Sequence, residues 1–362
     1  MHRLLFAAAG LAVAAAVGCG GGESTSCQPA GSGAPGWMIC DLDQDVEVLA
    51  LNDRGQIAAV DLGVGKPFLL KERKVVFLLG PGDHGVANAL NDRGQAVGWH
   101  ERVSRSEQAA FLWRDGKLTQ LEFSPVNNDA FGVNNVGQVV GASSDEYDLD
   151  DEGTAPRCAS EVVYGGRLNR PRAWLWEKGK FIEIGSLGGE VSAACGINDR
   201  GQVVGWSTTA QGRVHAFLWR KGRMTDLGTL PGGKTSSAQA VNDRGQVVGS
   251  ADTAAKDEFG TPIEHAFLWQ NGRLRDLGTV PGGGNFAASG INERGQVVGS
   301  SRIASGERRA FLWQDGKMTD LGTLPDGQTS DAVDINDRDQ IVGWSTTKNG
   351  QRHAVLWTLR SG

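Results

Sequence analysis

The amino-acid sequence predicts an all-β fold, a seven-bladed β-propeller whose blades each contain four strands. The first observation is a polar motif, Asn-Asp-Arg-Gly-Gln in its fullest form, which occurs seven times between apolar residues. The second is its spacing, because asparagines 39 to 64 residues apart are typical of propeller blades rather than helical repeats. The third is glycine, whose 53 residues in 362 indicate many tight turns. The seven asparagines are Asn52, Asn91, Asn134, Asn198, Asn242, Asn292 and Asn336.

Each repeat divides into four short strands, named a to d here. Strand a ends at the asparagine, strand b is "GQVVGS" after the motif, strand c is "HAFLW", and strand d is "RMTDLG". The pairs between c and d, such as Lys221-Gly222, favour hairpin turns whose twist matches paired strands. Between a and b, glycine supplies a positive φ that costs other residues about 1 to 2 kcal/mol. The seventh copy has Asp339 there, and Asp adopts this conformation more readily than most residues.

Side-chain size predicts where the strands lie within a blade. Small residues stand four positions before the asparagine in most copies, as at Ala194 and Ala332. Such residues suit the innermost strands, so strand a is expected to be innermost. The aromatic residues of strand c, such as Phe217 and Trp219, are expected to fill the gaps between blades rather than to form a carbohydrate-binding platform.

The two ends of the repeat region complement each other. The chain ends at a strand c, "HAVLWTLRSG", with no strand d after it. Near the beginning, residues 37 to 42 align with strand d but have no strand c before them. We therefore expect the N-terminal strand to complete the last blade, which removes two open sheet edges.

The repeated motif is explained by turn formation alone. The asparagine side chain bonds its own backbone two residues further on, and the Asp-Arg pair is expected to project into solvent. The alternative is a binding signature, in which the repeated motifs bind an acidic partner. We favour the turn, because a residue set that satisfies a turn needs no ligand to explain its repetition.

The N-terminal segment predicts export. Residues 1–18 have a basic start at Arg3 and an apolar stretch, the layout of a signal peptide. Cys19 follows Ala-Val-Gly, which is similar to a bacterial lipobox and predicts lipidation, with residues 19–36 as a flexible tether and residues 37–362 as the propeller. The alternative is cleavage near Ala14 to Ala16, which leaves a free secreted protein.

Four further cysteines can form two disulfide bonds in three ways. Proximity in the sequence favours Cys27 with Cys40, which leaves Cys158 with Cys195. There is no Cys-x-x-Cys pair and no spacing of Cys and His suited to zinc.

The charge distribution limits the classes of partner that the chain is expected to bind. The formal net charge is −6 and there is no run of Lys or Arg, which argues against nucleic acid. No apolar run is long enough for a transmembrane helix, so contact with a membrane is expected only through a lipid anchor. The expected partner is an extracellular protein, peptide or glycan, and we expect a monomer.

The repeats resemble a known family. The segment "HAFLWRKGRMTDLGTLPGG", residues 215 to 233, and motifs such as "INDRGQVVGWS" are similar to the HAF repeat family of probable extracellular proteins. The similarity covers residues 37 to 362 and is weakest in the first two units, where "KPFLLKERKVVFLLG" replaces the usual strands c and d. The resemblance implies an exported repeat protein, and it provides no catalytic residues to transfer to this chain.

Three groups of residues are candidate sites. Glu47, Asp129 and Asp331 stand five positions before their asparagines, where they could converge on a cation or polar ligand at the mouth of the propeller. A second group, Asp148, Asp150 and Glu152, resembles part of a calcium loop, although Ala159 stands where the loop needs a carboxylate; apart from this calcium candidate we expect no cofactor. A third group, His215, His265 and His353, begins strand c, and we expect solvated strand ends too far apart to share a metal.

These patterns favour a binding or scaffold module over an enzyme. No nucleophile with a base and no phosphate-binding loop is present in the sequence. The runner-up is a propeller enzyme, a lyase or glycosidase acting on an extracellular polymer through carboxylates at the mouth. Because the b to c connections vary most in length, we expect the ligand on that side, beneath the insertion of residues 142 to 171.

Overall fold

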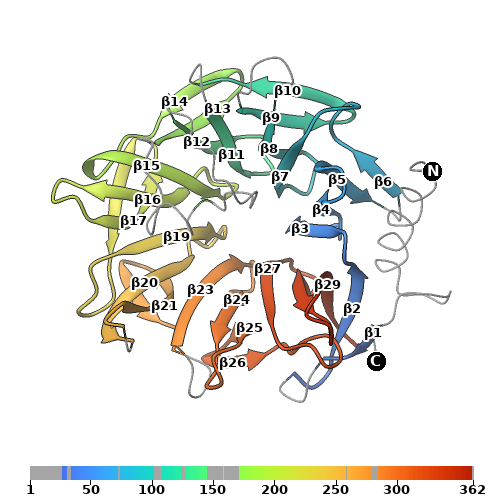
Figure 1. The fold of residues 1–362 in the computed structure, drawn as a ribbon. Coiled ribbons are helices and arrows are strands. Elements are labelled where there is room, and N and C mark those ends of the chain that lie inside the picture. Colours follow the sequence, from blue (N-terminus) through green and yellow to red (C-terminus); the bar gives the residue numbers. More distant parts are fainter. Residues whose placement is uncertain are drawn as a thin grey trace. The chain divides into compact units, whose positions relative to one another are not determined.

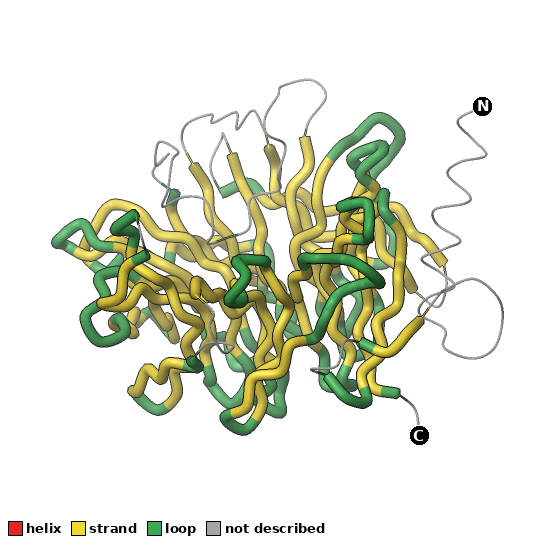
Figure 2. The backbone as a smooth tube through the Cα atoms, turned by 60° about the horizontal axis from the view of Figure 1, so that its bottom comes forward, coloured by secondary structure: helices red, strands yellow, loops and turns green. Residues whose placement is uncertain are grey.

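The computed structural model describes residues 27–30, 34–71, 74–101, 108–123, 127–144, 158, 171–257, 259–278 and 284–360. The fold is an all-β, seven-bladed β-propeller built of four-stranded antiparallel blades, as predicted. Figure 2 shows that the described residues form strands and loops without a helix. The chain divides into two compact units, residues 88–278 (unit 2) and residues 1–87 with 279–362 (unit 1).

Unit 2 holds blades 2 to 5, each a meander in the strand order a, b, c, d (Figure 1). The strands are β7 (Gly85–Leu90, which begins just before the boundary of the unit), β8 (Ala96–Glu101), β9 (Gln108–Arg114), β10 (Lys117–Leu121); β11 (Asn127–Val133), β12 (Val139–Ser144), β13 (Arg172–Glu177), β14 (Lys180–Glu183); β15 (Gly188–Ile197), β16 (Val203–Thr209), β17 (Val214–Arg220), β18 (Arg223–Gly228); β19 (Ser236–Val241), β20 (Val247–Lys256), β21 (Pro262–Gln270) and β22 (Arg273–Asp276).

Unit 1 holds blades 6, 7 and 1. The strands are β23 (Gly284–Ile291), β24 (Val297–Arg302), β25 (Arg308–Gln314), β26 (Lys317–Asp320); β27 (Ser330–Ile335), β28 (Gln340–Thr346), β29 (Arg352–Leu359), β2 (Trp37–Asp43), β1 (Cys27–Pro29); and β3 (Val46–Leu51), β4 (Ile57–Asp61), β5 (Lys66–Lys71), β6 (Lys74–Phe77).

The apolar core lies between adjacent blades, as the strand pattern predicts. Between blades 4 and 5, for example, Val204 and Ala216 pack with Val247 and Phe267. The aromatic positions of strand c are part of this core: Phe111, Phe217, Phe267 and Phe311 are fully buried. Burying each such ring stabilises the fold by about 1.5 to 3 kcal/mol, so these residues are core and not an exposed platform.

Turn chemistry follows the prediction. In blade 4, Lys221 and Gly222 both have positive φ (48° and 81°), the conformation of a type I′ hairpin turn. Asp339, which replaces the usual glycine of the a–b turn in blade 7, also has positive φ (58°). Backbone conformation at these positions therefore selects the residue.

The N-terminal strand completes blade 7, as predicted. Strand β2 pairs with β29 in antiparallel register from Trp37 opposite Leu359 onward, and Figure 1 shows the two side by side. Ile39 and Cys40 in β2 are fully buried. A fifth strand, β1, extends the sheet, and Cys27 is bonded to Cys40 across it, with a Cα–Cα distance of 4.0 Å.

Candidate functional site

The a–b turns form joints between neighbouring blades, as blade 4 illustrates. Asn198 is buried, and its Oδ1 accepts hydrogen bonds from the backbone N–H groups of Arg200 and Gln202 (3.1 and 2.9 Å). Its Nδ2 donates to Gln202 Oε1 and to the backbone carbonyl of Asn242 in blade 5, both at 2.8 Å. The bond to the next blade's carbonyl recurs from Asn91 to Asn134 and from Asn134 to Asn198 in unit 2, and from Asn292 to Asn336 and from Asn336 to Asn52 in unit 1. The motif is thus a connector between blades as well as a turn.

The acidic residue of the Asp-Arg pair is exposed or partly exposed, and it also accepts a hydrogen bond from the neighbouring blade, which was not expected. The Asp199 N–H donates to the carboxylate of Asp243 at 2.8 Å, and in unit 1 the Asp337 N–H donates to Asp53 at 2.7 Å. Within its own turn, the backbone N–H of the aspartate has no acceptor. The carboxylate of the aspartate in the next blade accepts its hydrogen bond. The arginine of the motif is exposed, as expected.

The expectation of solvated histidines is wrong. His215 Nδ1 lies 2.8 Å from the Asp226 carboxylate, and His265 Nδ1 lies 2.8 Å from Asp276, so each histidine joins strand c to strand d. In blade 7, His353 Nδ1 contacts Asp41 of β2 at 2.8 Å. These pairs hold strand d in place, and the N-terminal strand carries the same acidic partner as a true strand d.

Two of the three predicted mouth carboxylates lie in unit 1. Glu47 is half-buried on β3, and Asp331 is buried on β27, a strand in contact with β3. Asp331 Oδ2 lies 2.7 Å from Arg308 Nη2 on β25, and the Arg308 Nε–H also donates to Ser300 Oγ. Arg308 therefore already balances the charge of Asp331. That Glu47, Asp129 and Asp331 bind one ligand remains a prediction.

Asp129, the third predicted carboxylate, lies in unit 2 on β11. Its Oδ1 is buried and has no hydrogen-bond partner among the described residues. Burial raises the pKa of the Asp129 carboxyl to about 7, because the charged form loses its hydration. At neutral pH the group is therefore present in both its neutral and its charged form.

Other buried polar atoms of unit 2 also lack partners within the described part of the chain, among them Trp99 Nε1, Ser143 Oγ and Ser237 Oγ. Ser237 occupies the strand-a position that is equivalent to that of Asp129. Trp99 occupies the same strand-b position as Trp206, because each pairs with the equivalent alanine of strand c, Ala110 or Ala216. We call Trp99, Asp129, Ser143 and Ser237 the unpaired polar set. The sequence signal for it was polar variation five residues before the asparagine, which marked Asp129 and Ser237 but not the two strand-b residues.

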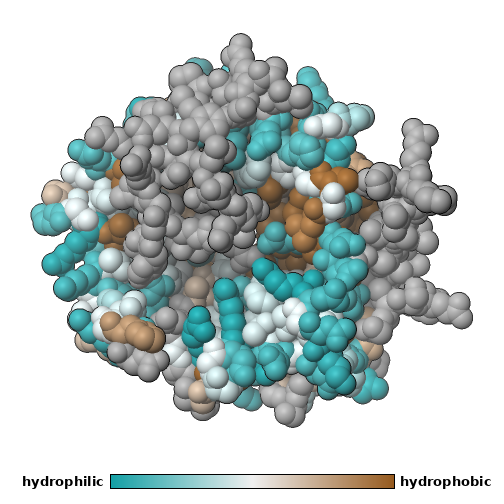
Figure 3. Space-filling view, viewed as in Figure 1, coloured by the Kyte–Doolittle hydropathy of each residue, from teal (hydrophilic) through white to brown (hydrophobic). Residues whose placement is uncertain are grey.

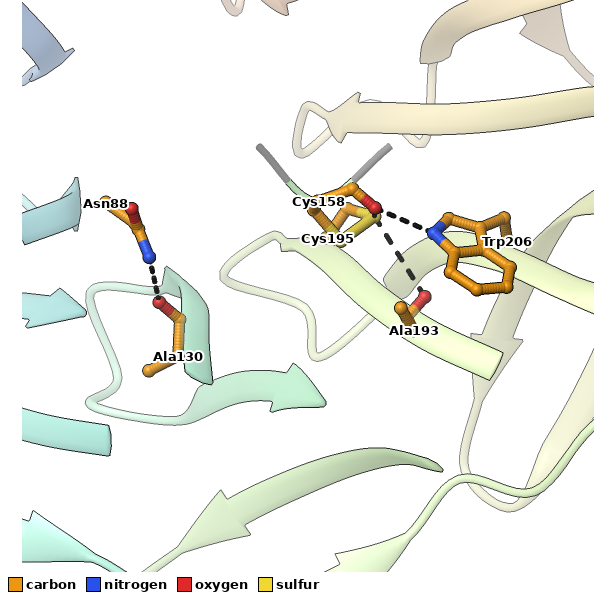
Figure 4. Close-up of a disulfide and its surroundings, with 6 residues drawn as sticks. All are labelled: Asn88, Ala130, Cys158, Ala193, Cys195 and Trp206. Atoms are coloured by element: carbon orange, nitrogen blue, oxygen red, sulfur yellow. Dashed lines mark hydrogen bonds between the residues drawn. A yellow bond between two sulfur atoms is a disulfide. The ribbon is translucent and has the colours of Figure 1, made fainter. Parts of the chain in front are cut away.

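The second disulfide also lies in unit 2. Cys158 is bonded to Cys195 of β15, and the Trp206 indole N–H donates to the carbonyl of Cys158 at 2.7 Å (Figure 4). In the same view Asn88 Nδ2 donates to the carbonyl of Ala130 at 3.0 Å, a bond between blades 2 and 3. The position of Trp206 shows how an indole at this level finds an acceptor, whereas Trp99 has none among the described residues.

A half-buried acid in unit 1, Asp334, was not predicted as a functional residue. Asp334 stands on β27 where other copies have glycine or alanine, and its Oδ2 accepts the Leu51 N–H of blade 1 at 2.9 Å. Burial is the main cause that raises the pKa of its carboxyl to about 7, and the nearby charge of Asp53 raises it further. Figure 3 shows mostly hydrophilic residues over β27 to β29.

Other candidates are not brought into a site. Asp148, Asp150, Glu152 and Cys19 lie outside the described residues. Among the residues that are described, no group of three or more Asp, Glu, His or Cys is placed to hold a metal ion, and no helix could span a bilayer. A pocket of about 360 Å³ in unit 1 is lined by residues such as Trp37, Leu312 and Lys317, and none of the predicted site residues lines it.

Comparison with known families corrects the predicted resemblance. The family described as "Protein of unknown function (DUF3466)" matches residues 123–274, so the assignment to the HAF repeat family is wrong, and no sign of a lipoprotein signal was found. The physical reason is that the quoted motifs are fixed by turn conformation and by the inter-blade joints, which do not distinguish one repeat family from another. No curated protein matches the chain.

Solved structures resemble the chain at the level of the fold alone. An acylaminoacyl peptidase in complex with Z-Gly-Gly-Phe-chloromethyl ketone is 11% identical, with a TM-score of 0.50 over 92% of this chain and 51% of that one, so the chain spans about half the length of the peptidase. A gluconolactonase from Xanthomonas campestris is 12% identical, with a TM-score of 0.45 over 94% and 98% of the two chains. YCF48 bound to D1 peptide is 11% identical, with a TM-score of 0.48 over 92% and 99%.

Proposed function

We propose that this chain is an exported binding or scaffold module whose ligand contacts the unpaired polar set of unit 2. Export is supported by the two disulfides, because such bonds persist in oxidising compartments. A binding role is supported by the architecture, in which short turns and inter-blade hydrogen bonds form a rigid frame for the more variable b–c connections.

One observation carries the choice of surface: the buried Oδ1 of Asp129 has no partner among the described residues. A buried acceptor without a donor destabilises the folded chain by about 1 to 3 kcal/mol, and a ligand N–H or O–H that fills it recovers this energy. The set combines an indole donor, two hydroxyls and a carboxyl. Such a mixture suits a ligand rich in hydroxyl or amide groups, a glycan or a peptide backbone.

The test is a glycan and peptide array probed with the full chain, followed by affinity measurements on the best binder. Asp129→Ala should weaken binding by about tenfold or more, since it removes a desolvated acceptor. The matched control is Glu183→Gln, which removes a carboxylate from an exposed position of the same unit and should leave the affinity unchanged. Equal affinities of wild type and Asp129→Ala would exclude this surface.

A second candidate, an enzyme of the lyase or glycosidase type, is favoured by the pKa of Asp129. A carboxyl that titrates near 7 suits general acid–base catalysis at neutral pH. The discriminating measurement is time-dependent release of new chain ends from any polymer that binds. Turnover that disappears in Asp129→Asn while binding persists would favour the enzyme; binding without turnover favours the module.

A further inference from the structure

One edge of the blades in unit 2 carries a concentration of positive charge. Strands a and c run parallel within a blade, so the a–b and c–d turns lie at the same edge, and Gln246 of one turn donates to Gln270 beside the other (3.3 Å). We call this the turn edge of unit 2: residues 92–95, 114–117, 135–138, 177–180, 199–202, 220–223, 243–246 and 270–273. It contains eleven Lys and Arg against five Asp and Glu, in a chain whose net charge is −6.

The basic side chains of the turn edge face solvent. All eleven are exposed: Arg93, Arg114, Lys117, Lys178, Lys180, Arg200, Arg220, Lys221, Arg223, Arg244 and Arg273. The acids are partly engaged in the joints, since Asp199 and Asp243 accept backbone N–H groups of the preceding blade. Asp115 and Glu177 lie near Arg114 and Lys178 (3.5 and 3.8 Å). Asp199 and Asp243 thus bond to backbone N–H groups, while the neighbouring Arg200 and Arg244 are exposed.

We propose that the turn edge of unit 2 binds an anionic polysaccharide, one that carries carboxylate or sulfate groups. Three observations select this partner. Seven of the eleven basic residues are arginine, whose planar fork pairs with such groups. Equivalent arginines recur on blades 2, 4 and 5, as the charges of a linear polymer recur along its length. Val136 is the one apolar residue among the turns defined above, so the edge lacks a wedge for a lipid surface and aromatic rings for stacking on bases.

This second surface makes the module a bridge, because it lies at the opposite end of the blades from the b–c connections. The proposal stands apart from the role of Asp129. The repeated motif would then have two roles. Its asparagine, aspartate and glutamine join the blades, and its arginine binds the partner, as in the binding alternative considered from the sequence.

The test uses the full chain with three polymers of similar length: heparin for sulfate, polygalacturonate for carboxylate and dextran as the neutral control. Wild type should bind one or both anionic polymers and not dextran, with an affinity that falls about tenfold or more between 50 and 200 mM salt. The triple variant Arg93→Gln, Arg200→Gln, Arg244→Gln should bind about tenfold more weakly.

The control triple variant is Arg213→Gln, Lys234→Gln, Lys256→Gln, which removes the same charge from exposed positions at the other edge of unit 2. It should bind within about twofold of wild type. Equal losses in the two triple variants would reduce the effect to net charge and overturn the proposal. Tighter binding to vesicles of anionic phospholipid or to duplex DNA than to either glycan would overturn the choice of partner. Asp129→Asn should keep full affinity for the anionic polymer, so this proposal and the proposed function fail separately.

Discussion

The joint between blades 4 and 5 can be tested by removing the Asn198 side chain. Asn198→Ala eliminates four hydrogen bonds, two accepted by Oδ1 and two donated by Nδ2. In the variant, water can accept the hydrogen bond from the backbone N–H of the exposed Arg200. The backbone carbonyl of the buried Asn242, however, loses its donor. Because each buried group left without a partner costs about 1 to 3 kcal/mol, the free energy of unfolding should fall by roughly 3 kcal/mol.

Two further variants separate the turn from the joint. Asn198→Asp keeps the acceptor for both N–H groups but places a carboxylate oxygen against the Asn242 carbonyl, so it should lose as much stability as Asn198→Ala at pH 7. It should recover part of this near pH 4, where the protonated acid donates again. Arg200→Ala, at an exposed position with its backbone N–H retained, should change stability by less than about 0.5 kcal/mol.

The assay is urea-induced unfolding followed by tryptophan fluorescence, with midpoints compared at constant slope. If Asn198→Ala loses no more than Arg200→Ala, the inter-blade hydrogen bonds do not hold the blades together. The account of the motif as a connector would then be wrong.

Two other predictions concern unit 1. The pKa of Asp334 is raised in the folded state, so the native chain holds a proton that the unfolded chain releases. As the pH rises from 5 to 7, Asp334 should therefore lower the free energy of unfolding by about 1.4 kcal/mol per pH unit. Asp334→Asn should remove the contribution of this residue to the slope, leaving that of Asp129, while retaining an acceptor for the Leu51 N–H. Identical pH profiles for the two proteins would contradict the prediction. Deleting residues 37 to 42 removes the buried Trp37, Ile39 and Leu42, each contributing about 1.5 to 3 kcal/mol, and should lower the Tm by several degrees, whereas an unchanged Tm would refute the closure.

The features that sequence predicted best are those set by local backbone conformation or by a periodic pattern. Asp339 was expected to have positive φ because it replaces a turn glycine, and it does. The pairing of β2 with β29 followed from a missing strand at each end of the repeat region. Burial of Phe217 followed from its place in strand c of every well-formed repeat.

Contacts made between blades were not predictable in the same way, because the partner lies about one repeat away in the sequence. The repeat shows that an Asp follows the Asn in five of the seven copies, but not that the backbone of the preceding blade donates to it. His215 was read as solvated because Asp226 is its partner only once strands c and d are paired. Asp331 was treated as a free carboxylate since nothing in the sequence links it to Arg308 on another blade.

The joint also bears on how such a chain can grow and diverge. In blades 2, 3, 4, 6 and 7 the asparagine amide donates to the turn carbonyl of the next blade, so the donor and the acceptor of the connection are both encoded within a single repeat. A gene duplication that copies one repeat, in register, would therefore supply a matching connection on both of its sides. The loops and the exposed arginines of a copied blade are not part of this connection, so they can change without removing its hydrogen bonds to the neighbouring blades.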